Sequence, residues 1–285
     1  MESFKKETKI LLLPSLFIFI VLGLFPTIWS IYLSLKKYNL TEPFDVEFIF
    51  FKNYINLLQD QRLYSSIVNT FIFLLFSIFV SLILGLILAI CLKKINKFRT
   101  IIYTFLIVPF VLPPAVIAYN FKFMMNYDFG IFNSFLLSIF SHKINFLGET
   151  SSALFSLIFI DIWQWTPFVT IILFSVLISL NPDPIEAAKI DGASNFQIFW
   201  FIIMPIIKPF IILVFLLRFI DVIKVYEIIN LVTSGGPGTS TETINIYLSR
   251  IAFDWFDLGY SCALSIVLIN IIIILTKKIL KIFES

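Results

Sequence analysis

Charged residues are scarce in this sequence, and histidine and cysteine are almost absent. Asp, Glu, Lys and Arg make up 14% of the 285 residues, and hydrophobic residues make up 59%. A soluble domain carries roughly 25% charged and 45–50% apolar residues. The shortage of charge extends along the chain, so we expect membrane lipid rather than water to surround most of the protein. The net charge of +3, without a basic stripe, gives no indication of a nucleic-acid partner.

The sequence also lacks the motifs of a metal, redox or nucleotide site. His142 is the only histidine, and Cys91 and Cys262 lie far apart inside apolar runs, so neither a metal site nor a disulfide is expected. No G-x-x-x-x-G-K-[ST] motif is present, and the glycine-rich segment 235–238 lacks the lysine that a phosphate-binding loop requires. The chain is therefore expected to be no enzyme, to hydrolyse no ATP and to carry no cofactor.

Long apolar runs are abundant instead. Six stretches approach or exceed the roughly 20 residues that a membrane-spanning helix needs: 10–35, 66–92, 100–124, 152–180, 205–231 and 259–280. The first is longer than the apolar region of a signal peptide and is interpreted as a retained span. Continuous apolar runs exclude the alternating strands of a membrane barrel. The predicted fold is an all-α, polytopic membrane protein with six transmembrane helices.

The basic residues of the loops predict the orientation of these spans. With the N-terminus in the cytoplasm, twelve Lys and Arg residues lie inside and six outside, which favours an N-in, C-in topology. The strongest single element is the short loop 93–99, with Lys93, Lys94, Lys97 and Arg99.

Two spans contain residues with structural meaning. Ser81, Gly85 and Ala89 recur every four residues in the second span, a spacing that lets helix backbones approach closely in lipid. The third span contains Pro109, Pro113 and Pro114. Prolines there indicate either a structural kink or a helix that lines a cavity.

The loop 181–205 between spans four and five has a defined local pattern. Pro184 suits the first turn of a helix, the run 186–189 (Glu-Ala-Ala-Lys) has high helix propensity, and Gly192 can end that helix with a positive φ. A second amphipathic stretch with Phe196, Phe199 and Trp200 leads back to the membrane. The pattern predicts a stiff elbow, which is either a plain connection or a docking element for a soluble partner.

This elbow resembles the "EAA" loop of binding-protein-dependent ABC importer permeases. The family pattern is E-A-A, three residues, G, nine residues, I-x-L-P. Glu186, Ala187, Ala188 and Gly192 match it, and 202–205 follow at the required spacing with Met204 in place of Leu. The resemblance implies that Glu186 to Gly192, with Asp191, form the coupling helix that fits a groove on an ATP-binding subunit. It also implies a type I importer permease fold.

Further segments resemble carbohydrate-type permeases of that family, namely 161–168, 218–221 and 233–238, where Ser234 stands in place of the usual Gly. The resemblance implies import of a sugar or polyol by alternating access. It implies as partners two ATP-binding subunits, a second permease subunit that is a paralogue rather than a second copy, and an extracytoplasmic substrate-binding protein. The expected domains are 1–65 (first span and outer loop), 66–280 (transmembrane domain with the coupling loop 181–205) and 281–285 (cytoplasmic tail).

Several polar residues fall at membrane depth, where ionisable groups normally face a bundle interior or a cavity. Arg218, Asp221, Lys224 and Glu227 are three residues apart and would share one slowly drifting face of the fifth span. At about 1.5 Å per residue, Asp161 of the fourth span lies at the depth of Arg218, and we expect these two to pair. Either the four charges of the fifth span pair with one another and lock that helix, or they form a polar wall of the translocation path.

The same depth holds side chains that a sugar site would use. Trp163, Gln164 and Trp165 offer aromatic faces and an amide, although Trp is also common at membrane interfaces. The candidate path thus comprises Asp161, Trp163, Gln164, Trp165, Arg218, Asp221 and Lys224. The alternative function is an ion-coupled secondary transporter or channel that uses the charges of the fifth span.

Overall fold

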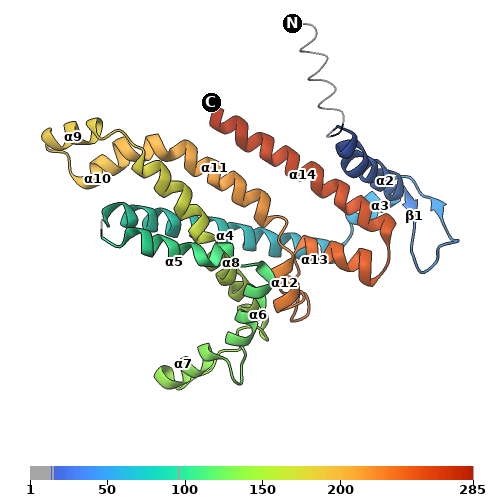
Figure 1. Ribbon diagram of the computed structural model, residues 1–285. Helices are drawn as coiled ribbons and strands as arrows, with labels where there is room; N and C mark the ends of the chain where they lie inside the picture. Colours follow the sequence, from blue (N-terminus) through green and yellow to red (C-terminus); the bar gives the residue numbers. More distant parts are fainter. Residues whose placement is uncertain (1–13, 15, 96, 285) are drawn as a thin grey trace, which may run out of the picture. The chain divides into compact units, whose positions relative to one another are not determined.

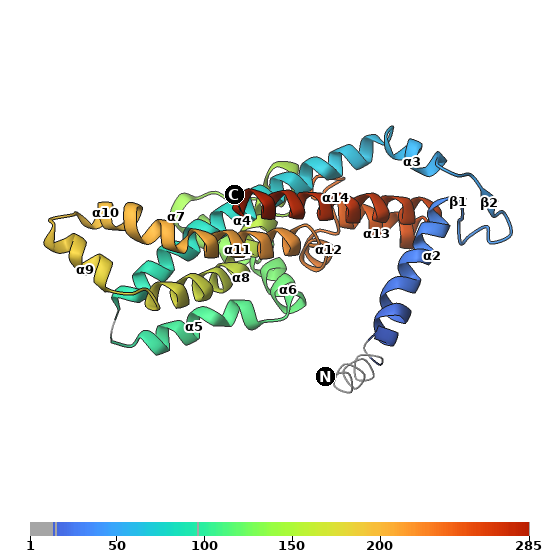
Figure 2. The ribbon, with the colours of Figure 1, turned by 90° about the horizontal axis from the view of Figure 1, so that it is seen from above.

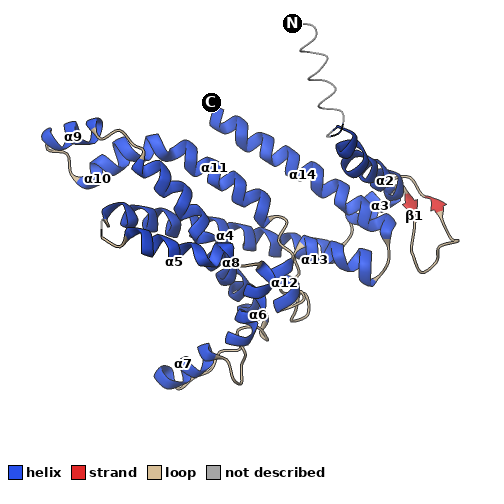
Figure 3. Cartoon of the chain, viewed as in Figure 1, coloured by secondary structure: helices blue, strands red, loops and turns tan. Residues whose placement is uncertain are grey.

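The computed structural model describes residues 14, 16–95 and 97–284, and almost all of its regular structure is helical (Figure 3). Five helical segments within this part are long and apolar enough to cross a membrane: Leu16–Ser34, Gln61–Lys94, Thr150–Ile178, Asn195–Val222 and Leu258–Lys281. The bent pair Arg99–Val111 and Pro114–Met124 makes a sixth if it counts as one span. The predicted all-α membrane fold is confirmed, although residues 10–13 and 15 of the first predicted span lie outside the described residues.

The helices belong to two compact units. Of the described residues, the first comprises those within 1–63 and 247–274, and the second those within 64–246 and 275–285. The first unit contains the π-helical turn η1 (Ile20–Leu24), α2 (Phe25–Ser34), the strands β1 (Lys36–Lys37) and β2 (Glu47–Phe48), α3 (Lys52–Leu57) and the π-helical turn η3 (Arg250–Asp254). The strands pair antiparallel, with Lys36 opposite Phe48.

A small core closes the first unit. Leu57, Leu63, Ile251 and Leu264 are among its buried apolar residues. Beside them, the carboxylate of Asp60 accepts hydrogen bonds from the hydroxyls of Tyr247 (2.5 Å) and Tyr260 (2.6 Å). These bonds tie the loop before the second span to residues about 200 positions later in the chain.

The second unit is built around α8 (Thr150–Ile178), which contacts α5 (Arg99–Val111), α6 (Pro114–Met124), α11 (Met204–Val222) and α12 (Glu227–Val232) (Figures 1 and 2). In its most apolar stretch 61% of the residues are buried, against 17% for the Asn195–Val222 segment. The remaining elements are α7 (Ile131–Phe140), α9 (Asp183–Ile190), α10 (Asn195–Ile198) and η2 (Phe199–Ile203). Three helices contribute residues to both units: α4 (Gln61–Lys94), α13 (Ile244–Ser249) and α14 (Leu258–Glu284).

The small residues of the second span pack as predicted. Ser81 and Ala89 are fully buried. A Cβ atom on Gly85 would lie 2.5 Å from Cγ1 of Val169 and 3.2 Å from the backbone nitrogen of Thr170. Only glycine therefore allows α4 to lie this close to α8.

The third predicted span, 100–124, is not one helix. Helix α5 ends at Val111, α6 begins at Pro114, and the two axes differ by 93°. Leu112 and Pro113 both have extended backbones, with ψ of 138°, because a residue that precedes proline is driven out of the helical region. The consecutive prolines thus produce a sharp turn, and Pro114 lines a cavity.

The fifth predicted span, 205–231, also ends early. Helix α11 stops at Val222, and a turn of four residues leads to α12. The carbonyl of Ile223, released at this end, accepts a hydrogen bond from Asn245 Nδ2 (2.7 Å), and Lys122 Nζ donates to the carbonyl of Leu231 at the end of α12 (2.9 Å). The bond from Asn245 thus satisfies a carbonyl that a longer helix would have used internally. The expectation that Lys224 and Glu227 continue the helical face of Arg218 was wrong.

Candidate functional site

The predicted coupling loop, 181–205, forms an elbow of two short helices (Figures 1 and 2). Helix α9 begins after Pro182, has Pro184 in its first turn, and carries Asp183 and Glu186 where acidic side chains favour a helix start. Beyond its end Gly192 adopts φ +79°, and a Cβ atom at this position would meet no other atom within 4 Å. The predicted helix followed by a glycine turn is confirmed.

A capping box starts the second helix of the elbow, α10. The Oγ of Ser194 accepts from the backbone N–H of Gln197 (3.3 Å), and Gln197 Oε1 accepts from the N–H of Ser194 (2.8 Å). The Ser-x-x-Gln spacing was visible in the sequence as a helix-start signal. These reciprocal bonds fix the turn between α9 and α10 independently of any partner.

The two faces of α9 differ in what they present. Glu186, Ala187 and Gly192 are exposed, and Ile190 is 86% exposed. Ile185 and Lys189, one turn apart, lie on the opposite side and line a cavity with the end of α4. The outer face thus combines small residues with one large apolar side chain, which suits docking into a groove. Ile190 was not among the coupling residues predicted from the sequence.

A buried ion pair joins α8 to α11. Nη2 of Arg218 donates to Oδ2 of Asp161 at 2.5 Å, and both side chains are at most 2% exposed. Nη1 donates to Asp221 at 3.1 Å, whose side chain is 44% exposed. The guanidinium group also lies over the ring of Trp165, 4.6 Å from its centroid. The predicted pairing of Asp161 with Arg218 is confirmed.

Five of the predicted path residues line one cavity of about 330 Å³: Asp161, Gln164, Trp165, Asp221 and Lys224. The same cavity is lined by Pro114, Tyr226 and Glu227. Sequence reasoning placed Glu227 among the charges of the fifth span but left it out of the candidate path, and it did not consider Tyr226. The turn at 223–226 bends the chain so that Tyr226 and Glu227 face the residues of α8.

One buried polar atom of this cavity has no hydrogen-bond partner. Gln164 is 3% exposed, and its Oε1 has no hydrogen-bond partner in the part of the chain that the structure describes. A buried acceptor without a partner is costly unless a ligand or water completes it. The cavity thus combines an unused acceptor, carboxylates, an ammonium group and aromatic rings, a set that can hydrogen-bond several hydroxyl groups.

The remaining two path candidates lie elsewhere. Arg218 does not line the cavity, because its side chain is fully buried behind the carboxylates. Trp163 lines a separate cavity of about 430 Å³ with Asn120 and Phe121, and its ring packs edge-on against Phe121. The structure therefore separates Trp163 from the other predicted path residues.

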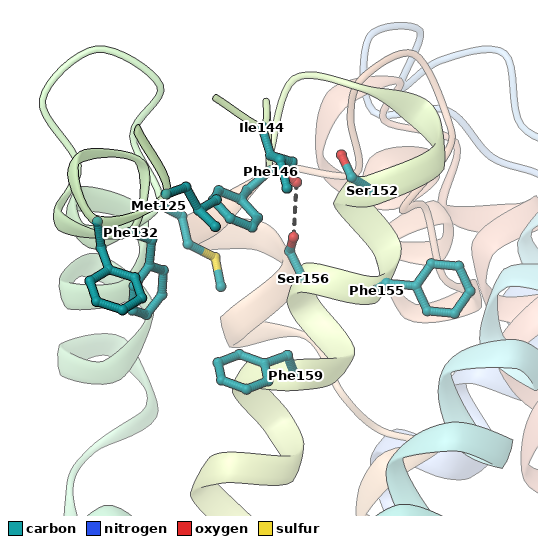
Figure 4. Close-up of a pocket in the computed structure, with 10 residues that line it drawn as sticks. Met125, Phe132, Ile144, Phe146, Ser152, Phe155, Ser156 and Phe159 are labelled. Atoms are coloured by element: carbon teal, nitrogen blue, oxygen red, sulfur yellow. Dashed lines mark hydrogen bonds between the residues drawn. The ribbon is translucent and has the colours of Figure 1, made fainter. Parts of the chain in front are cut away.

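Another cavity, of about 470 Å³, lies between the end of α6, helix α7 and the start of α8 (Figure 4). Its lining is apolar, with Met125, Phe132 and Phe159 among the residues drawn. Among the described residues that line it, only Ser152 and Ser156 carry hydroxyl groups, and both donate to backbone carbonyls, of Asn145 and Phe146. This lining offers no free polar group for a hydrophilic solute.

The loop after α12 is held by α4. Asn69 Nδ2 donates to the carbonyls of Thr239 and Glu242, and Thr70 Oγ1 accepts from the N–H of Ile244. Ser234 occupies a position where the carbohydrate-type permeases that this sequence resembles have glycine. It adopts φ +51°, and its Oγ donates to the carbonyl of Asn230. The left-handed backbone at this position accounts for the family's glycine.

Within the described residues no group of three His, Cys, Asp or Glu side chains is arranged to hold a metal ion. The chemistry that this arrangement supports is recognition through hydrogen bonds and aromatic contacts.

Comparison with known proteins matches residues 81–281 to the family described as "Binding-protein-dependent transport system inner membrane component". The trehalose/maltose transport system permease protein MalF of Thermococcus litoralis is 32% identical over 271 residues, covering 95% of this chain and 90% of the relative. The sulfoquinovosyl glycerol transport system permease protein SmoG of Agrobacterium fabrum is 26% identical, covering 97% of this chain and 90% of the relative.

Among solved structures, a bacterial ABC transporter involved in the import of the acidic polysaccharide alginate has a similar chain, with a TM-score of 0.86, 20% identity, and coverage of 99% of this chain and 96% of that chain. A bacterial alginate ABC transporter in complex with an alginate pentasaccharide-bound periplasmic protein gives a TM-score of 0.85 at 20% identity, covering 98% and 94%. At this identity the likeness concerns the fold.

Proposed function

Since the chain belongs to the family of binding-protein-dependent transport system inner membrane components, a family of multi-pass membrane permeases and not of enzymes, we propose that it is the permease subunit of an ABC importer for a sugar or polyol. The observation that carries the proposal is the similarity to a trehalose/maltose permease along 95% of the chain. A second relative is named for the transport of sulfoquinovosyl glycerol, which also contains a polyol.

The energy comes from ATP hydrolysis on partner chains. This sequence has no phosphate-binding motif, and two ATP-binding subunits supply the hydrolysis. Helix α9 docks on one ATP-binding subunit through Glu186, Ala187, Ala188, Asp191 and Gly192. The exposed side chain of Ile190 adds an apolar contact. The rigid elbow, closed by the Ser194 capping box, then transmits the movement of the ATP-binding subunit to α8 and α11.

Two further partners complete the importer. A second permease subunit, a paralogue of this chain, forms the other half of the translocation path. An extracytoplasmic protein delivers the substrate, in the manner suggested by the alginate transporter and its alginate pentasaccharide-bound periplasmic protein. The topology is N-in and C-in, with 1–65 as first span and outer loop, 66–280 as transmembrane domain and 281–285 as cytoplasmic tail.

The cavity lined by Asp161, Gln164, Trp165, Asp221 and Lys224 forms this subunit's wall of the path. Gln164 Oε1 accepts a substrate hydroxyl, and Asp221 and Lys224 exchange hydrogen bonds with others. Asp161 and Arg218 hold α8 and α11 in register behind this wall. Alternating access, driven through the elbow, opens the cavity first outward and then inward. Trp163 contributes from the neighbouring cavity.

Co-purification tests the proposal. The chain, expressed with its transporter partners and extracted in mild detergent, should retain an ATP-binding subunit, and Ile190→Asp should lose it without a lower unfolding temperature. Asp183→Asn, an exposed change in the first turn of the same helix, is the matched control and should keep the subunit. If no ATP-binding subunit is retained by the unmutated chain, the charged cavity must be tested as an ion-coupled pathway.

A further inference from the structure

A cavity of about 620 Å³ lies between the coupling loop and the ends of α4 and α8. Three lysines line it: Lys93 and Lys94 from the last turn of α4, and Lys189 from α9. The rest of the lining is mainly apolar and includes Ile90, Leu177, Ile198 and Ile203. The lining of this cavity thus combines three basic side chains with an apolar surface.

Among the described residues, no carboxylate lines this cavity. The acidic side chains of the elbow, Asp183, Glu186 and Asp191, are exposed and absent from the lining. None of the three lysines forms an ion pair with another of the described residues. The cavity therefore concentrates positive charge that this part of the chain does not neutralise.

The face of α9 that carries Lys189 is not the proposed docking face. Ile185 and Lys189 are one turn apart and face the cavity, whereas Glu186 and Ile190 lie on the outer side of the helix. An ATP-binding subunit seated on the outer face leaves the lysine side of α9 turned toward the membrane-spanning helices. A ligand in this cavity would not compete with that subunit for α9.

The chemistry of the lining selects an amphiphile. A small anion would pair with the lysines but would bury no apolar surface against the rest of the lining. An apolar chain would bury that surface but would leave the lysines unpaired. A phospholipid uses both, and basic pockets between transmembrane helices on the cytoplasmic side bind lipid head groups. That this cavity faces the cytoplasm follows from the proposed function. The inference rests on the proposed function for this orientation alone.

We propose that this cavity binds an anionic phospholipid of the cytoplasmic leaflet. Its phosphate lies against Lys93, Lys94 and Lys189, and one acyl chain lies along Ile90, Leu177, Ile198 and Ile203. A lipid in this place bridges α4 and α9, and it stiffens the elbow through which the ATP-binding subunit acts.

The test is a thermal-unfolding titration of the purified, detergent-solubilised transporter. Phosphatidylglycerol should raise the unfolding temperature, whereas phosphatidylcholine and inorganic phosphate should not. The variant Lys93→Gln/Lys94→Gln/Lys189→Gln should bind phosphatidylglycerol more weakly by about an order of magnitude or more. The matched control Lys277→Gln/Lys278→Gln/Lys281→Gln, which removes as many charges from α14 outside this cavity, should keep the unmutated affinity.

Three results overturn the proposal. Equal loss of affinity in both variants means that the lipid responds to net charge and not to this cavity. Stabilisation by inorganic phosphate alone means that the site binds a free anion. No response of the unmutated protein to phosphatidylglycerol means that no lipid binds. If the glutamine variant does not fold, Lys93→Arg/Lys94→Arg/Lys189→Arg replaces it: retained charge should retain binding, and lost binding contradicts the proposal.

The readout separates this inference from the transport function. Lipid binding does not depend on uptake, so it can fail while import stands. Labelling of Asp183→Cys in sealed vesicles with a membrane-impermeant reagent, compared with the unmutated chain, reports which side of the membrane the elbow occupies. Labelling from outside would overturn the orientation, and with it both the docking of an ATP-binding subunit and the leaflet assigned to the lipid.

Discussion

Arg218 and Asp161 form a buried ion pair that joins α11 to α8, with Nη2 of the arginine 2.5 Å from Oδ2 of the aspartate. Asp221 shares the same guanidinium group from one helical turn away, but its side chain is 44% exposed. The two carboxylates therefore have unequal roles. Asp161 balances the arginine inside the bundle, and Asp221 extends the charge network to the edge of the cavity.

The first prediction concerns this inequality. Asp161→Ala leaves the buried Arg218 with only the half-exposed carboxylate of Asp221 as a counter-charge and should destabilise the protein by about 3–5 kcal/mol. Asp221→Ala should cost much less, because water already reaches its carboxylate. The unfolding temperature in detergent measures both. Asp161→Leu/Arg218→Met, which removes both charges, should recover most of the stability, and equal losses from the two alanine variants would contradict the interpretation.

The second prediction concerns Gly85, where α4 and α8 are in contact. Gly85→Ala forces a methyl group to within 2.5 Å of Val169 Cγ1, and such overpacking costs about 1–3 kcal/mol. Gly85→Ala/Val169→Ala should recover part of this loss by making room. Gly23→Ala is the control, because a Cβ there would meet only Phe19 at 3.5 Å, an ordinary contact distance. A neutral Gly85→Ala would show that the helices can move apart freely.

The sequence predicted what depends on local pattern. Apolar length located the spans apart from the break in the third and the early end of the fifth. The Pro184 and Gly192 positions located α9, and the spacing of Ser81, Gly85 and Ala89 located a close helix contact. The pairing of Asp161 with Arg218 followed from depth alone, since each helix rises by a constant 1.5 Å or so per residue.

Where the sequence failed, tertiary contacts decide the backbone. Nothing local stops the fifth helix at Val222, and the hydrogen bond from Asn245 to the Ile223 carbonyl comes from another helix. That one turn carries Tyr226 and Glu227 to the cavity, and neither residue was part of the predicted path. The separation of Trp163 from Trp165, by contrast, could have been predicted, because residues two apart in a helix point to different sides, and the two line separate cavities.

The third prediction concerns pH. Burial by itself raises the pKa of the Asp60 carboxyl, but hydrogen bonds from Tyr247 and Tyr260 and from the N–H groups of Leu63 and Arg62 outweigh it and lower the pKa below 3.8. The unfolded chain thus binds this proton more tightly than the folded chain. The stabilisation is full at neutral pH and is lost as the pH falls through the folded pKa.

Asp60→Asn should accordingly lower the unfolding temperature at pH 7, and the difference from the unmutated protein should shrink below about pH 4. Asp45→Asn serves as control, because this carboxylate pairs with Lys37 at the surface and such pairs contribute little. A difference that stays constant from pH 7 to acid would show that the geometry of the two tyrosine hydrogen bonds, and not the charge of Asp60, provides the stability.

The last prediction separates recognition from stability at Gln164. Its buried Oε1 has no partner among the described residues, so Gln164→Leu removes an unsatisfied group and should leave the unfolding temperature unchanged or raise it. If that oxygen accepts a substrate hydroxyl, the loss of one hydrogen bond of about 0.5–1.5 kcal/mol should raise KM for uptake into proteoliposomes severalfold. Asn120→Leu, whose amide in the neighbouring cavity already donates to the Val116 carbonyl, should leave KM unchanged. Unaltered uptake by Gln164→Leu would contradict the assignment of this oxygen as an acceptor for a substrate hydroxyl.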